Sequence, residues 1–346
     1  MDHIAIDLGM KQSQVCIRNP RSEIVFEGRY PTERLAKVLA ARPRGRVILE
    51  TCSEAFAVAD MLTEAGHDVQ VVPATLARAL GVGERGLKND QRDARAISAA
   101  SCRADLPAVH VPTKVSRDLK AMSTARESLV ETRTKQINCV RAHLRTRLLK
   151  VKRGSPETFP ARAREALLQD EDGVPQYIER QLLLLEMLNE QINAANKELM
   201  TVAKKNPVCG RLMTIPGVGP ITAVRFVAAI DRIDRFPSAS RVGSYLGLTG
   251  GEKASGEKSY STSLTKAGSS KVRWTLVQAA WSAMRTRPND PMVRWATRIA
   301  VRRKKHVAAV ALARKMAGVM YALWRDGSNY NPMRAASLEE EASLAA

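Results

Sequence analysis

The chain has 346 residues, and its 55 Lys and Arg against 35 Asp and Glu give a formal net charge of +20. Such an excess points to a polyanionic partner, most economically nucleic acid, because Lys and Arg neutralise phosphates. Five widely spaced cysteines without a C-x-x-C pair argue against disulfide and zinc frameworks, and the lack of a long apolar run or signal peptide argues against a membrane partner.

The first third of the chain predicts a mixed sheet covered by helices. Apolar or alternating runs bounded by turn residues predict strands over 3–8, 14–18, 23–28, 46–50 and 68–72. Helical spacing of apolar residues predicts helices over 32–41, 53–65 and 94–104. The order βββαβαβα is that of the ribonuclease-H-like fold, so residues 1–112 are expected to form such a domain.

Four carboxylates in this region suit a metal site. Asp7 lies late in the first strand, and Glu50 closes the fourth strand, which neighbours the first in this fold. Asp90 and Asp93 lie three apart at the start of a helix and therefore share one face. Four converging carboxylates do not all stay ionised without cations. The cations that could balance them are Lys88, Arg92, Arg95 and a divalent metal ion.

Oxygen ligands of this kind suit Mg²⁺ or Mn²⁺, which bridge phosphate oxygens. The alternative for Asp90 and Asp93 is a solvated helix start, where acids are favoured by the helix dipole. Whether both of them contact metal, or one orients the other, stays open at this point.

The middle of the chain, 113–205, predicts two long helices. The first, 115–152, carries an apolar stripe from Leu119 to Leu148 and many basic residues, among them Arg141 and Arg145. This density of charge favours binding to a phosphate backbone, RNA included, over a merely solvated face. The second, 175–205, has the spacing of a coiled-coil seam, with Asn189 and Asn196 at two seam positions. An intramolecular hairpin and a dimerising coiled coil both fit this pattern.

The last part, 206–330, predicts a mostly helical domain. Its segment 212–223 has the pattern of a helix–hairpin–helix motif, in which Gly217 and Gly219 would let backbone N–H groups hold a phosphate. A glycine-rich loop with Ser255 follows, and 271–324 is expected to be helical. Other residues expected to bind nucleic acid are Lys266, Arg273, Arg302, Arg303, Lys304 and Lys305. The tail 331–346, rich in Ala, Ser and Glu, is expected to be disordered.

The four carboxylates resemble the D-E-D-D set of the RuvC-like domain in one family of insertion-sequence transposases. These are the bridge-RNA-guided serine recombinases, relatives of the Piv DNA invertases. The run 4–7, the strand end at Glu50-Thr51 and the N-D-x-x-D-A-R motif at 89–95 carry the resemblance. The hairpin at 212–223, the G-L-T run at 247–249 and the T-K-A-G motif at 265–268 extend it to the C-terminal part.

The resemblance implies that Asp7, Glu50, Asp90 and Asp93 bind Mg²⁺ and that Ser255 is the nucleophile. Gly250 stands where proline is common in the family, and three serines are alternatives to Ser255. These alternatives are Ser259, Ser261 and Ser263. The implied reaction is DNA strand exchange through a covalent phosphoserine intermediate, without free ends.

The implied partners are donor and target double-stranded DNA and a non-coding bridge RNA. Dimers would assemble into a tetramer whose metal site and serine come from different protomers. The setting would be the bacterial cytoplasm, at the nucleoid when the protein is active.

Three alternatives compete with this interpretation. A RuvC-like, metal-dependent Holliday-junction resolvase or nuclease would use water as nucleophile, and Ser255 would then be structural. A non-catalytic nucleic-acid-binding protein would carry a degenerate site. The run 6–13 also resembles the phosphate loop of actin-like and Hsp70-like ATPases, but the second phosphate loop and the adenosine loop of that class are missing from the sequence.

Overall fold

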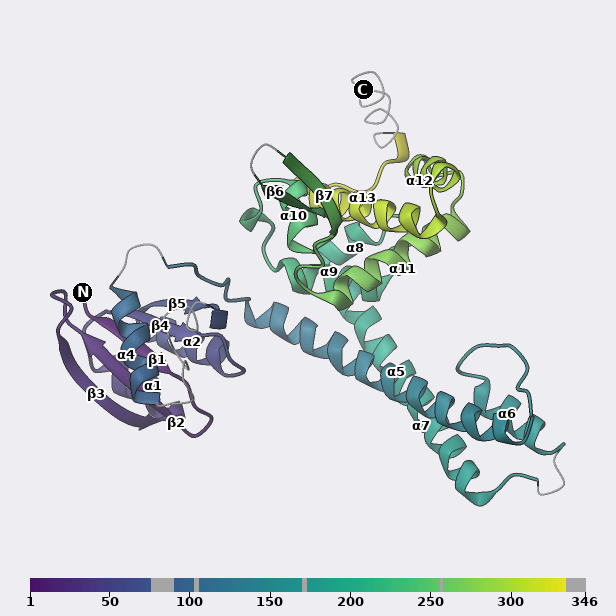
Figure 1. Cartoon of the computed structure of the whole chain (residues 1–346), viewed down its shortest axis with the longest axis horizontal. Coiled ribbons are helices and arrows are strands. Elements are labelled where there is room, and N and C mark those ends of the chain that lie inside the picture. Colours follow the sequence, from purple (N-terminus) through teal and green to yellow (C-terminus); the bar gives the residue numbers. More distant parts are fainter. Residues whose placement is uncertain (76–89, 103–105, 170–172, 256–257, 334–346) are drawn as a thin grey trace. The chain divides into compact units, whose positions relative to one another are not determined.

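The computed structural model describes residues 1–75, 90–102, 106–169, 173–255 and 258–333. The side chains at 90–93, 252–255, 258, 259 and 261 lie outside this description, as does most of the tail predicted to be disordered. The chain divides into two compact units, Met1–Pro112 and Thr113–Ala346 (Figure 1), and each is described by itself.

The first unit is a five-stranded mixed sheet with helices on both faces. Its elements are β1 (His3–Asp7), β2 (Gln12–Arg18), β3 (Ile24–Pro31), η1 (Thr32–Arg34), α1 (Leu35–Ala40), β4 (Arg46–Glu50), α2 (Ala55–Glu64), β5 (Asp68–Val72) and α4 (Asp90–Ser101). The strand order is β3-β2-β1-β4-β5. Strands β1, β2 and β3 pair antiparallel, whereas β4 pairs parallel with β1 and with β5. This arrangement confirms the predicted element order and is consistent with a ribonuclease-H-like domain.

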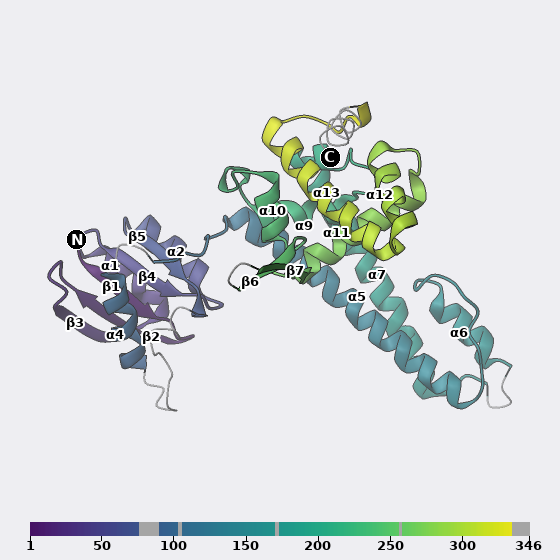
Figure 2. The ribbon, with the colours of Figure 1, turned by 45° about the horizontal axis from the view of Figure 1, so that its top comes forward.

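Alternation along the strands divides the apolar side chains between the two faces of the sheet. Ile4 and Ile6 of β1 are fully buried in a core shared with α1 and α2. Ala5 lies on the opposite face, where it packs with Ile48 of β4 and Ile97 of α4. Helix α4 therefore covers the face opposite to α1 and α2, as Figures 1 and 2 show.

Helix α4 runs antiparallel to β1 and β4. Its last residue, Ser101, accepts a hydrogen bond on its carbonyl oxygen from Nη1 of Arg46 at 3.3 Å, and Arg46 is the first residue of β4. The C-terminal end of α4 is thus beside the start of the parallel strands. The N-terminal end of α4 consequently points to the edge of the sheet at which β1 and β4 end.

Over its described residues, the second unit is helical apart from one β-hairpin. Its elements are α5 (Lys114–Thr146), α6 (Phe159–Leu167), α7 (Gln176–Lys205), α8 (Pro207–Leu212), α9 (Pro220–Ile230), η3 (Ile233–Arg235), α10 (Ala239–Tyr245), β6 (Gly250–Ser255), β7 (Lys258–Leu264), α11 (Ser270–Thr286), α12 (Pro291–Arg302) and α13 (Lys305–Asp326). Helix α5 ends before the predicted boundary at 152. Leu148, predicted to lie in the apolar stripe of that helix, instead lies beyond its end with a positive φ and is 90% exposed.

Helices α5 and α7 pack on each other as an intramolecular hairpin (Figure 1). The predicted seam of α7 is buried by α5, and both seam asparagines bind arginines of α5. Arg133 donates to Oδ1 of Asn189 at 3.0 Å, and Arg126 donates to Oδ1 of Asn196 at 3.0 Å. The hairpin alternative is therefore the one observed, and a dimer would have to use another face of α7.

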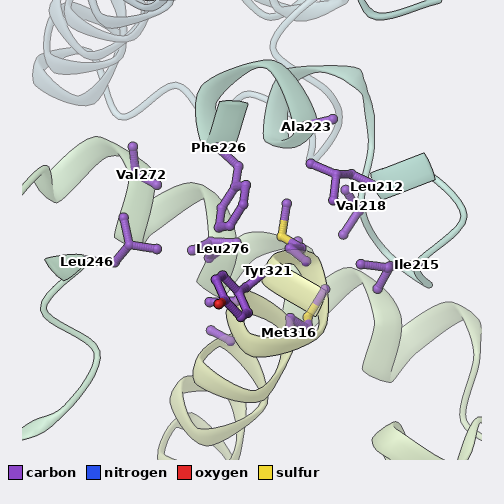
Figure 3. Close-up of a cluster of buried hydrophobic side chains, with 14 of the residues drawn as sticks. Leu212, Ile215, Val218, Ala223, Phe226, Leu246, Val272, Leu276, Met316 and Tyr321 are labelled. Carbon is purple, nitrogen blue, oxygen red and sulfur yellow. The ribbon is translucent and has the colours of Figure 1, made fainter. Parts of the chain in front are cut away.

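The base of this hairpin belongs to the C-terminal core. Leu119 of α5 and Leu199 of α7 pack in the same cluster as residues of α8, α9, α11, α12 and α13. Figure 3 shows part of this cluster, with Phe226 of α9, Leu276 of α11 and Met316 of α13. The distal half of the hairpin has its own core, in which α6 covers Ile137 and Leu182. The packing thus continues across the predicted domain boundary between 205 and 206, because α9 contacts both long helices.

Helix α13 lies along the C-terminal core. By length and composition it is apolar enough to cross a membrane, which corrects the sequence-based expectation that no apolar run approaches that length. Half of this apolar segment is buried, and Leu312, Met316 and Met320 are fully buried in the core. Its apolar character is accounted for by this packing.

One buried ion pair ties α5 to α9. Arg225 is 5% exposed and donates to Oε2 of Glu127 at 2.5 Å and to Oγ1 of Thr275 at 2.7 Å. Without Arg225, the largely buried Glu127 carboxylate would keep only more distant cations, Arg126 at 3.7 Å and Lys271 at 3.9 Å. A buried pair broken on one side is strongly destabilising.

We predict that Arg225→Ala lowers the free energy of unfolding of the second unit by about 3 kcal/mol. Urea denaturation followed by tryptophan fluorescence measures this, because all four tryptophans belong to that unit. Arg232→Ala is the matched control, since its pair with Asp234 is more than half exposed on both sides. An equal effect of both substitutions would contradict the prediction.

Candidate functional site

Two of the predicted carboxylates meet at one edge of the sheet. The parallel pairing of β1 with β4 runs from His3 opposite Arg46 to Ile6 opposite Leu49, and the next residues along the two strands are Asp7 and Glu50. Alternation gives Asp7 the face of Ala5 and Glu50 the face of Ile48. Both positions therefore lie on the face that α4 covers, at the carboxyl ends of neighbouring strands.

The other two carboxylates are carried by the first turn of α4. Asp93 and Asp90 precede Ile97 by four and by seven positions, so their backbone positions lie on the helix face that packs on Ala5. The direction of α4 takes this turn toward the edge where β1 and β4 end. Their side chains lie outside the described residues, so the structure does not place their oxygen atoms.

Arg95 is one of the cations that could balance the four carboxylates at this edge. Its guanidinium pairs with both carboxylate oxygens of Glu27 on β3, at 2.5 and 2.6 Å, so it is already matched by an acid of its own. That pairing raises the pKa of Arg95, first through the hydrogen bond and then through the charge of Glu27. Lys88 and the side chain of Arg92 lie outside the described residues. Arg95 is therefore held by Glu27 on β3, away from the role of balancing the four acids that the sequence suggested for it.

The donor set fits a divalent metal. Carboxylate oxygens from two neighbouring strand ends and one helix face are the hard ligands that Mg²⁺ and Mn²⁺ prefer. Within the part of the chain whose side chains are described, no three His, Cys, Asp or Glu groups gather closely enough to hold a metal ion. A complete site would accordingly need Asp90 or Asp93 in addition to Asp7 and Glu50.

Ser255 lies at the end of a strand, which corrects the prediction of a glycine-rich loop. Strands β6 and β7 form an antiparallel hairpin in which Ser255 pairs with Lys258, Ala254 with Ser259 and Glu252 with Ser261. Paired residues in such a ladder share a face, so the backbone positions of Ser259 and Ser261 belong to the face opposite to that of Ser255. The register therefore separates Ser255 from these two alternatives, although the side chains of Ser255, Ser259 and Ser261 lie outside the described residues. The pairing shifts register between Ser261 and Leu264, so it does not assign Ser263 to a face. The third alternative, Ser263, is exposed.

The base of the hairpin is held by close backbone packing. Gly247 and Gly268 both have a positive φ, and a Cβ on either would lie within 2.3 Å of a carbonyl oxygen of the facing segment. Arg273 clamps the same place, because its Nη1 donates to the carbonyl oxygens of Leu246, Ala267 and Gly268. The guanidinium of Arg273, which was predicted to bind nucleic acid, is thus engaged within the protein. Lys266 is exposed and also has a positive φ of 54°.

The two glycines of the predicted helix–hairpin–helix motif have different surroundings. Gly217 has a φ of +80°, and a Cβ there would lie 2.2 Å from the carbonyl oxygen of Ala279 in α11. Gly219 precedes α9 with a φ of −98°, and a Cβ there would meet nothing within 4 Å. Packing against α11 therefore requires glycine at position 217, whereas the space around position 219 would accept a larger residue.

We predict that Gly217→Ala lowers the free energy of unfolding by about 2 kcal/mol or more, because the backbone of α11 has to move away. Gly219→Ala should cost less than about 1 kcal/mol. Urea denaturation followed by tryptophan fluorescence compares the two. Equal costs would mean that the structure accommodates a Cβ at position 217 without displacing α11.

The remaining residues predicted to bind nucleic acid are at the surface. Arg141, Arg145, Arg302, Arg303, Lys304 and Lys305 are exposed. The guanidinium of Arg141 also lies over the ring of Phe159 at 5.2 Å. Arg302 lines a groove with Trp295, which was not among the predicted residues. The sequence could have indicated Trp295 through helical spacing, since it lies seven positions before Arg302 in α12 and therefore on the same face of the helix.

Comparisons with known proteins cover both units. Residues 4–147 match a DEDD transposase domain of IS110 elements, with the description "Transposase". Residues 209–294 match the "Transposase IS116/IS110/IS902 family". The chain is 28% identical to the transposase for insertion sequence element IS1111A of Coxiella burnetii, over 92% of this chain and 88% of the relative. It is 28% identical to the transposase for IS1328 of Yersinia enterocolitica, over 95% and 98%.

A further relative is a probable family 20 transposase of Pseudomonas aeruginosa. It is 25% identical to this chain, over 96% of this chain and 99% of the relative. The similarity to all three relatives thus extends over nearly the whole chain. The residues matched by the two family models include both the edge of the sheet with the carboxylates and the hairpin with the serine.

Proposed function

Since this chain is a transposase of the IS110/IS116/IS902 family, which catalyses DNA strand transfer, we propose that it is an RNA-guided DNA recombinase that works through a phosphoserine intermediate. The observation that supports the proposal best is the position of Asp7 and Glu50 at the ends of neighbouring strands, toward which the N-terminal end of α4 points. The DEDD domain indicates dependence on a divalent metal. We assign that role to Mg²⁺ or Mn²⁺ at Asp7, Glu50, Asp90 and Asp93.

In the proposed reaction the four carboxylates hold the metal and Ser255 is the nucleophile. A divalent cation at the four carboxylates would act as a Lewis acid toward phosphate oxygens. The Ser255 hydroxyl would lose its proton and bond to phosphorus, and a deoxyribose oxygen would leave and take up a proton. A hydroxyl of another strand would then displace Ser255 and restore a phosphodiester. The covalent intermediate conserves the energy of the broken bond, which permits rejoining.

The partners in this proposal are donor and target DNA, a bridge RNA and further copies of the chain. The excess of basic residues supports binding to nucleic acid. A dimer, as the building block of a tetramer, finds support in the exposed apolar residues of α7, where Leu183 and Met187 are both more than half exposed. The place of action would be the bacterial cytoplasm, at the nucleoid.

The experiment that tests the proposal is a search for its covalent intermediate. The protein is purified with the RNA that accompanies it, and that RNA is sequenced. With DNA carrying the ends of the element and Mg²⁺, we expect a labelled protein–DNA adduct on a denaturing gel, and EDTA should abolish it. Cleavage in Mg²⁺ without an adduct would favour the metal-dependent nuclease instead, and the absence of a defined RNA would remove the guide from the proposal.

A further inference from the structure

The second unit contains a groove of about 1190 Å³ between α10, α12, α13 and the base of the β6–β7 hairpin. This volume exceeds the roughly 300–1000 Å³ of small-molecule sites, so it suits a segment of polymer. Gly250 and Leu264, which pair at the base of the hairpin, form part of its wall. The groove therefore adjoins the element that carries Ser255.

The rim of the groove is basic. Arg298 and Arg302 come from α12, and Arg314 and Lys315 come from α13. The described residues that line the groove include no carboxylate. Arg302 and Arg314 are exposed, which keeps their guanidinium groups accessible to an anionic ligand. The charge of the rim thus complements a chain of phosphates.

The rest of the lining is largely apolar and includes an aromatic ring. Leu248, Val307 and Val310 contribute aliphatic surface, and Trp295 lies beside them with Nζ of Lys315 at 4.6 Å from its ring centroid. In a nucleic-acid duplex the base faces are stacked inside, so the protein can contact only the phosphates, the sugars and the base edges in the major and minor grooves. An unpaired strand offers base faces as well, which pack on apolar and aromatic side chains.

We propose that this groove binds an unpaired nucleic-acid strand, with its phosphates on the arginines of the rim and its bases on Trp295 and the apolar lining. The proposal rests on the proposed function, because a transposase that exchanges strands exposes unpaired DNA and a guide RNA offers unpaired loops. Strand β6 places Ser255 five residues from Gly250, which is roughly 17 Å along the hairpin. The groove would accordingly hold nucleotides at some distance along the strand from the bond that Ser255 attacks.

The test measures binding of full-length protein to labelled oligonucleotides of roughly ten nucleotides by fluorescence anisotropy, in EDTA. The probes are single-stranded DNA, RNA of the same sequence and the corresponding DNA duplex. For the double variant Arg302→Ala with Arg314→Ala, we expect affinity for the unpaired strand to fall at least tenfold near 0.15 M salt. The slope of log affinity against log salt should decrease by about 1.4, or roughly 0.7 for each arginine removed from a phosphate.

Trp295→Ala should weaken binding of the unpaired strand on the order of tenfold, with little change in the salt slope. Arg325→Ala is the control for the loss of an arginine, because it removes one positive charge from α13 at a residue outside the groove that pairs with Asp326. Thermal unfolding of each variant shows that it is folded. The stronger of the DNA and RNA responses identifies which strand occupies the groove.

Unchanged affinity of the folded double variant for both unpaired probes would overturn the proposal. An equal loss of affinity for the duplex would also overturn it, because the groove would then bind phosphates alone. Binding in EDTA needs neither metal nor serine chemistry. A failure here with a normal protein–DNA adduct therefore refutes only the groove, whereas normal binding without an adduct refutes only the recombinase mechanism.

Discussion

Replacing Asp7 with asparagine is expected to reduce DNA cleavage and strand exchange in Mg²⁺ by at least about a hundredfold. Asparagine keeps the size of the side chain and removes one negative charge from the edge where β1 and β4 end. The loss of activity follows because a metal bound as a Lewis acid contributes several kcal/mol, and each 1.36 kcal/mol is a factor of about ten. Strand cleavage of labelled DNA, followed over a range of Mg²⁺ concentrations, measures the effect.

Asp68→Asn is the matched control for this substitution. Asp68 is the first residue of β5 and is exposed at the opposite end of the parallel strands, so it should retain wild-type activity. Glu50→Gln should behave like Asp7→Asn. If Asp7→Asn and Asp68→Asn were equally active, the edge at Asp7 would not be the metal site.

Replacing Ser255 with alanine is expected to abolish the covalent protein–DNA adduct and to lower strand exchange on the order of a thousandfold or more. Alanine removes only the hydroxyl and leaves the paired backbone of β6 in place. Binding to the same DNA should persist, because the basic residues of the second unit are untouched. Denaturing gels of the reaction and anisotropy of DNA binding measure the two quantities side by side.

The serines of β7 provide the controls for Ser255. Ser259→Ala alters the opposite face of the same hairpin, Ser263→Ala alters β7 nearer to the base of the hairpin, and both should keep the adduct. An adduct that survives Ser255→Ala and disappears with Ser259→Ala would move the nucleophile to β7. Cleavage at the wild-type rate by Ser255→Ala would instead favour a nuclease that uses water.

The sheet of the first unit could be predicted because its signals are local. Ile4, Ala5 and Ile6 form an apolar run short enough for a strand, and the strand order follows from how the connections alternate with helices. The positions of Asp7 and Glu50 then follow from two strand ends. The orientation of α4 could be inferred only as part of the fold, and the bond from Arg46 to Ser101 gives it directly.

The second unit was harder to predict because tertiary contacts decide the role of its residues. The basic pattern of α5 did not distinguish Arg133, which is buried against Asn189, from the exposed Arg145. The glycines around Ser255 indicated a loop, although a neighbouring strand pairs with that segment. The motif around Gly217 indicated phosphate binding, and only the approach of α11 reveals that packing requires this glycine.

The α5–α7 hairpin is anchored in the C-terminal core at one end only. Helix α5 has 33 residues and is therefore about 50 Å long, and its base is built into the C-terminal core through Leu119. The paired helices resist bending because their seam is buried along most of its length. A partner that binds the distal end, near α6, would thus transmit a turning force along the hairpin to the helices that surround the serine hairpin.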